Sequence, residues 1–123
     1  MAKEKAAVEL DGTFLYRQLW AETRPAPHTV IVEQKVPGPP RALWISGWTK
    51  RWEFDPVRIH RVIADDLHQA TSMVTFVDRT TAEELATSMG QTLPDERTLA
   101  EFMAAAAQEM QTSGDWKTPI PLS

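Results

Sequence analysis

Prolines divide the first half of the chain into three short extended segments. Pro25 and Pro27 make the first break, and the Pro-Gly-Pro-Pro run at 37–40 makes the second. Proline has no amide hydrogen to donate to a strand ladder, so a central strand cannot continue through either break. Because the connections between the segments are short, we predict a three-stranded antiparallel meander. Its strands are expected at residues 13–22, 28–36 and 44–52.

The second predicted strand alternates between apolar and polar side chains. Val30 and Val32 face one way, while Glu33 and Lys35 face the other. Ile31 is the exception, because it places an apolar side chain among the polar ones. The pattern predicts a half-buried strand, with one face toward the core and one toward solvent.

Three tryptophans at intervals of four dominate the third segment. In a strand, Trp44, Trp48 and Trp52 share one face. The same spacing would align them on a helix, but Gly47 and the β-branched residues between the tryptophans favour a strand. Two interpretations stay open. The three rings form the floor of the core, or Trp52 stays exposed where the strand runs into a charged turn.

The second half of the chain carries helical signals. Asp55 and Pro56 form a helix start, and apolar residues then recur at helical spacing over residues 55–70. Residues 72–78 form a short apolar run that suits a buried strand. A capping-box pattern of Thr81 with Glu84 starts a helix that Gly90 ends. The last helix begins near Pro94 and has an apolar face made of Leu99, Phe102, Met103, Ala106 and Met110.

The resulting order, β-β-β-α-β-α-α, predicts an α+β domain. We expect its helices to pack on one face of a mainly antiparallel sheet. Residues 1–12 are predicted to be a flexible N-terminal lead-in and residues 13–112 a single domain. Residues 113–123 are predicted to form an extended C-terminal tail with Trp116 as its large anchor.

Composition narrows the classes of function. The 123-residue chain has no cysteine, which excludes disulfides, thiolate catalysis and cysteine-based metal sites. No apolar run approaches the ~20 residues that span a bilayer, and the N-terminus lacks a signal-peptide pattern. We therefore expect a soluble, cytoplasmic protein that does not contact membranes. The formal net charge of −4 is uneven, since residues 1–54 carry +2 and residues 55–123 carry −6.

Catalytic and metal-binding patterns are absent or weak. The chain lacks the GxSxG, HExxH, P-loop and GxGxxG motifs. His60 and His68 lie two helical turns apart, with Asp65 three residues before His68, so these groups could converge for proton transfer or metal binding. A solvated helix face explains the same spacing, and metal sites usually need three or four ligands. We assign no catalytic residue, metal or cofactor from the sequence.

The leading hypothesis is a small non-enzymatic interaction or regulatory module that acts through protein–protein contacts. Self-association through the sheet edge or the last helix is part of this hypothesis. One alternative is nucleic-acid or nucleotide binding by the basic, tryptophan-rich residues 50–61. Another is a small enzyme that uses His60, Asp65 and His68. The candidate binding residues are Trp52, Lys50, Arg51, Arg58 and Trp116.

Overall fold

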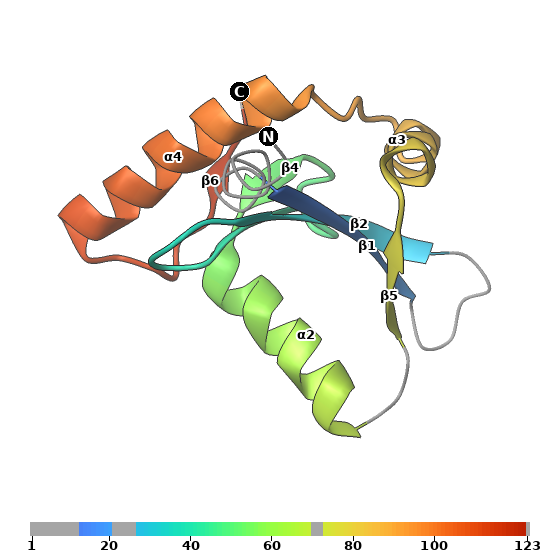
Figure 1. Cartoon of the computed structure of the whole chain (residues 1–123), viewed down its shortest axis with the longest axis horizontal. Helices are drawn as coiled ribbons and strands as arrows, with labels where there is room; N and C mark the ends of the chain where they lie inside the picture. Colours follow the sequence, from blue (N-terminus) through green and yellow to red (C-terminus); the bar gives the residue numbers. More distant parts are fainter. Residues whose placement is uncertain (1–12, 21–26, 70–72, 123) are drawn as a thin grey trace, which may run out of the picture.

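A computed structural model describes residues 13–20, 27–69 and 73–122 of the chain (Figure 1). Within these residues, six strands form one sheet in the spatial order β5-β1-β2-β3-β4-β6. All neighbouring strands pair antiparallel. The strands are β1 (Thr13–Trp20), β2 (Pro27–Lys35), β3 (Arg41–Ile45), β4 (Trp52–Phe54), β5 (Val74–Val77) and β6 (Ile120–Pro121). The helices are α2 (Pro56–Gln69), α3 (Arg79–Ser88) and α4 (Glu96–Ser113).

The mixed α+β class is confirmed, and so are the first two strands and the helix after Asp55. The predicted three-stranded meander with one further strand is wrong, because the sheet has six strands. Two segments account for the difference. The tryptophan segment makes two strands instead of one, and residues 120–121 near the C-terminus add a sixth.

A tight hairpin turn separates β3 from β4. The Ser46 amide donates to the Arg51 carbonyl at 2.9 Å, and the Lys50 amide donates back to the Ser46 carbonyl at 2.9 Å. The Ser46 hydroxyl accepts from the Trp48 amide at 3.1 Å, and Lys50 adopts a positive φ of 62°. The chain therefore reverses within residues 46–51, and Ile45 pairs with Trp52. A single strand over residues 44–52 is thus wrong, because a serine side chain supports a turn there.

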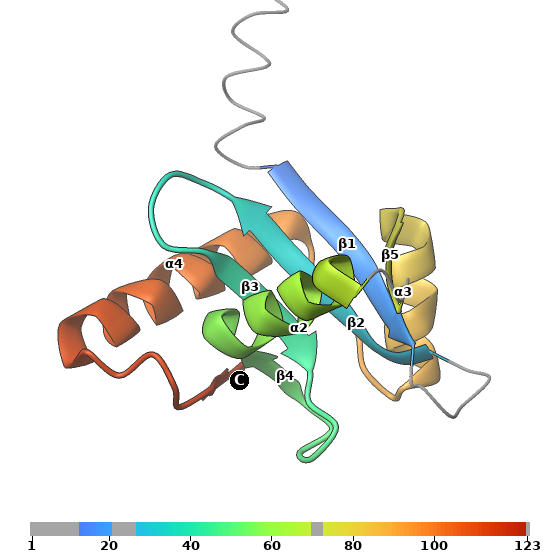
Figure 2. The ribbon, with the colours of Figure 1, turned by 90° about the horizontal axis from the view of Figure 1, so that it is seen from below.

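Helices cover both faces of the sheet (Figure 1, Figure 2). On one face, α3 and α4 pack against the alternate β2 residues Val30 and Val32. On the opposite face, α2 packs its Ile59 and Ile63 against Ile31 of β2. The prediction that all helices pack on one face is wrong, and Ile31 was the signal against it. An apolar residue at the expected solvent position is buried because a helix lies over that face.

Helix α4 covers the larger of the two cores, which lies between the sheet and helices α3 and α4. Its expected apolar face is confirmed, since Leu99, Met103 and Met110 are fully buried against the sheet. Phe102 meets Phe54 of β4 edge to face, with ring centroids 6.3 Å apart. The Asp95 carboxylate caps the helix by accepting from the Thr98 amide at 2.8 Å.

Strand β5 occupies an edge of the sheet. The buried strand predicted at residues 72–78 is therefore wrong in its burial, because β1 is the only neighbour of β5 in the described part of the chain. Phe76 is 63% exposed, and the Arg17 guanidinium lies 4.1 Å from its ring centroid. Helix α3 follows, capped by Asp78, whose carboxylate accepts from the Thr81 amide, and not by the predicted Thr81. Gly90, at φ 78°, follows its end as expected.

The C-terminal segment returns to the sheet. Residues 113–123, predicted as an extended tail, include β6, which pairs with β4. The Leu122 amide donates to the Trp52 carbonyl at 3.0 Å, and Trp116 packs against the larger core. The predicted lead-in at residues 1–12 lies outside the described residues. Among the residues that are described, no helix is long and apolar enough to cross a membrane.

We expect removal of the residues after Gly114 to destabilise the fold. This truncation keeps the cap of α4 and deletes both the Trp116 contact and strand β6. Loss of the partly buried tryptophan and of the β4 pairing should lower the free energy of unfolding by at least about 2 kcal/mol, measured by urea denaturation. Lys117→Ala in the full chain is the control and should change stability by less than about 0.5 kcal/mol. An unchanged stability after truncation would contradict the packing of this segment.

Candidate functional site

A surface cavity of about 360 Å³ lies beside the β3–β4 hairpin. We call it the hairpin pocket. Its lining residues come from β3, the hairpin turn, β4, the start of α2 and the C-terminal segment. The residues that line it are Trp44, Ser46, Gly47, Trp48, Thr49, Glu53, Asp55, Arg58 and Pro119.

Two tryptophans supply the aromatic surface of the hairpin pocket. Trp44 is half-buried and packs against the α2 face of the sheet. Trp48 lies in the turn and is 90% exposed. Its exposed indole therefore adds an aromatic face to the rim of the pocket.

Two buried carboxylates form the acidic part of the pocket. Because successive side chains of β4 point to opposite faces, Trp52 and Phe54 lie in the larger core and Glu53 lies on the other face. Glu53 is 9% exposed and accepts from the Thr49 hydroxyl at 3.0 Å. Asp55 is 3% exposed and lies just before α2.

The electrostatics of the hairpin pocket favour a positively charged ligand. Burial raises the pKa of Asp55, the Arg58 guanidinium opposes this rise, and the neighbouring Glu53 carboxylate adds to it. The Arg58 Nε atom lies 3.6 Å from an Asp55 oxygen, and most of the Arg58 side chain is exposed. Among the residues that line the cavity, one guanidinium faces two carboxylates. A cation that entered would meet this excess negative charge and the faces of indole rings.

The structure exchanges the predicted roles of two tryptophans. Trp52, which one of the two interpretations left exposed, is 3% exposed and donates its indole N–H to the Thr92 carbonyl at 3.0 Å. Trp48, predicted to be part of the sheet floor, is the exposed ring. The reversal follows from the turn, which breaks the shared face of the three tryptophans.

The other predicted binding residues are divided between the hairpin turn and two cavities. Lys50 and Arg51 are exposed in the turn, and the Lys50 carbonyl accepts from the Gln91 side chain at 2.7 Å. Arg58 lines the hairpin pocket, and Trp116 lines a neighbouring cavity. Sequence reasoning did not identify Glu53 and Asp55 as site residues. The available signal was that they alternate along the chain with Trp52 and Phe54, which lie in the core.

The histidines predicted as a possible enzyme site lie on the outer surface of α2. His60, Asp65 and His68 are all exposed. Within the described ranges, no group of three or more His, Cys, Asp or Glu side chains is placed to hold a metal ion. The described part of the chain therefore offers no metal site in support of an enzyme that uses these three residues.

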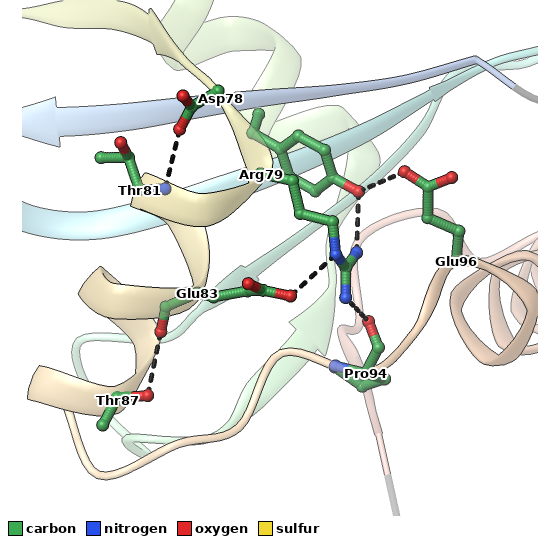
Figure 3. Close-up of polar contacts among 8 residues, drawn as sticks. Asp78, Arg79, Thr81, Glu83, Thr87, Pro94 and Glu96 are labelled. Carbon is green, nitrogen blue, oxygen red and sulfur yellow. Dashed lines mark hydrogen bonds and ion pairs between the residues drawn. The ribbon is translucent and has the colours of Figure 1, made fainter.

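A second polar cluster is centred on Arg79 at the start of α3 (Figure 3). Its guanidinium donates to the Tyr16 hydroxyl at 2.9 Å, to the Pro94 carbonyl at 2.7 Å and to Glu83 at 3.0 Å. The Tyr16 hydroxyl donates to Glu96 at 2.8 Å. Burial and the hydrogen bond to Glu96 raise the pKa of Tyr16 to about 12. These bonds tie β1, α3 and α4 together, so we interpret the cluster as structural.

No protein-family model, curated protein or solved structure matches this chain. The interpretation of the hairpin pocket therefore rests on its residues and geometry.

Two alanine variants in the same hairpin should separate a surface tryptophan from a core tryptophan. Trp48→Ala is expected to change the free energy of unfolding by less than about 0.5 kcal/mol, because its ring is exposed. Trp52→Ala is expected to cost about 3–5 kcal/mol, because it opens a cavity in the larger core. Urea denaturation of both variants measures the difference. Equal destabilisation by the two would show that Trp48 is a packing residue.

Proposed function

We propose that this protein is a non-enzymatic interaction module whose hairpin pocket receives a positively charged side chain of a partner protein. The observation that carries the proposal is the joint presence of an exposed tryptophan and two buried carboxylates around one cavity. Aromatic faces and carboxylates are the two groups that bind organic cations in proteins.

Arginine is the partner side chain that fits this chemistry best. Its planar guanidinium bonds to carboxylates through several N–H groups and also stacks on aromatic rings. The cavity of about 360 Å³ lies near the small end of ligand pockets, which span roughly 300–1,000 Å³. That size supports a single side chain as ligand.

Nucleic-acid binding by residues 50–61 is the alternative, and two buried carboxylates within the same stretch count against it. Lys50, Arg51, Arg58 and Arg61 are all exposed and could contact phosphates. Glu53 and Asp55 lie within the same stretch, and their charges would repel a phosphate backbone. Titration with a single-stranded oligonucleotide at low salt distinguishes the two functions, because steep salt-dependent binding would favour nucleic acid.

The proposal is tested with acetyl-arginine amide as the probe. We expect it to shift the amide signals of the hairpin turn in NMR spectra of the ¹⁵N-labelled protein. The uncharged acetyl-norleucine amide should not do so. Trp48→Ala should weaken binding by about two- to fivefold through loss of cation–π attraction. Glu53→Gln should weaken binding by about tenfold or more through loss of a charged hydrogen-bond acceptor.

Phe76→Ala is the matched control for Trp48→Ala. Phe76 is also an exposed aromatic residue, but it lies on β5, at the opposite edge of the sheet from β6. Its removal should leave the affinity for acetyl-arginine amide unchanged. Equal shifts from the arginine and norleucine probes, or an unchanged affinity in Glu53→Gln, would contradict the proposed function.

Binding of acetyl-arginine amide should weaken on acidification. The raised pKa of Asp55 means that this carboxylate takes up a proton at a higher pH than an ordinary aspartate. Its charge is lost as the pH falls through this raised pKa, so affinity should fall with it. NMR titrations from about pH 7 to about pH 4.5 measure the effect. Asp55→Asn should bind more weakly than the original chain above that pKa and respond less to acid, and an identical pH profile in this variant would exclude Asp55 as the cause.

A further inference from the structure

A second cavity, of about 340 Å³, adjoins the hairpin pocket. We call it the Trp116 pocket. Asp55 and Arg58 line both cavities, so the two share a wall at the start of α2. The C-terminal segment also borders both, since it contributes Pro119 to the hairpin pocket and Trp116 to the second one. The two cavities are therefore neighbours that share Asp55 and Arg58, and we call the pair the groove.

The two halves of the groove have opposite charge. Arg58, Arg61 and Lys117 line the Trp116 pocket, and Asp55 is its one acidic lining residue. That carboxylate already faces the Arg58 guanidinium at 3.6 Å. Lys117 also interacts electrostatically with the nearby Asp115 carboxylate. With Asp115 counted, three basic side chains oppose two carboxylates, so this half keeps an excess of positive charge. The hairpin pocket, with Glu53 and Asp55, has an excess of negative charge.

The local structure holds the basic half in place. Asp115 accepts from the Lys117 and Thr118 amides at 2.9 and 3.1 Å, which forms a tight turn after α4. Trp116 packs against the larger core, and β6 follows two residues after Thr118. Lys117 is therefore presented from a turn that is anchored on both sides.

We propose that the ligand is an extended segment of a partner protein that carries both a basic and an acidic residue. The basic residue enters the hairpin pocket, and the acidic residue contacts Arg61 and Lys117 in the Trp116 pocket. Charge complementarity along the groove is the reason for both assignments. This inference rests on the proposed function, because the first contact is the cation site described above.

Such a ligand also gives the groove selectivity. A nucleic acid would satisfy the basic half but would place phosphates beside Glu53 and Asp55. A purely basic peptide would satisfy the acidic half but would be repelled by Arg61 and Lys117. A segment with one charge of each sign avoids both repulsions.

The test uses short glycine peptides in which an arginine and a glutamate are separated by zero to four glycines. Matched peptides carry glutamine in place of glutamate. Affinities are measured by NMR titration of the ¹⁵N-labelled protein, with the Trp48 and Trp116 indole signals as reporters. At the best spacing, the arginine–glutamate peptide should bind about two- to fivefold tighter than its glutamine partner, as expected for an exposed ion pair. The Trp116 signal should shift only with glutamate present.

Protein variants assign the gain to the Trp116 pocket. The double variant Arg61→Gln with Lys117→Gln should abolish the gain in affinity that glutamate gives. Its affinity for the glutamine peptide should not fall. Arg51→Gln is the control, because this exposed arginine belongs to the hairpin turn and lines neither cavity. It should keep the full gain.

Failure of this inference is distinguishable from failure of the proposed function. If the glutamine peptides bind but no spacing gives a gain from glutamate, the two-part groove is overturned and the cation site stands. If the arginine peptides do not bind at all, the proposed function is overturned and this inference with it. If the double variant changes the oligomeric state measured by light scattering and no peptide shows the gain, the groove holds a second copy of the chain, which also overturns the proposal.

Discussion

The turn at residues 46–51 is the constraint on which the rest of the structure depends. Its backbone bonds between Ser46 and Arg51 and between Lys50 and Ser46 reverse the chain after β3. The reversal makes β4 a separate strand whose alternate residues face opposite sides of the sheet. Trp52 and Phe54 complete the larger core, while the acidic residues between and after them line the hairpin pocket. One turn therefore builds both the core and the candidate site.

Asp55 connects the stability of α2 with the chemistry of the groove. Its carbonyl accepts from the Ile59 amide at 3.0 Å, at the start of the helix, and its carboxylate lines both cavities. Burial of this carboxylate raises its pKa, since a charge removed from water is costly unless it is paired. Arg58 compensates part of that cost from the exposed side. A bound cation would compensate more of it, which is the physical argument behind the proposed cation site.

Much of the local structure could be predicted from the sequence, but the candidate site could not. The apolar stripe from Leu99 to Met110 and the Asp55-Pro56 start correctly predicted α4 and α2. The same kind of reasoning placed Trp48 in the sheet and Trp52 at the surface, which is the reverse of the structure. Regular spacing of four suggested one continuous strand, and the turn-forming effect of the Ser46 side chain was not recognised.

The sequence by itself determined the elements whose signals lie within a few residues of one another. Proline breaks, helix caps and apolar periodicity are such signals, because they act through neighbouring backbone groups. Only the tertiary structure decided which face each helix covers, which tryptophan is buried and where the C-terminal segment lies. These features depend on contacts between residues far apart in the chain, such as the bond from Trp52 to Thr92 and the bond from Leu122 to Trp52. The groove lies where such distant segments meet, so no local pattern in the sequence could show it.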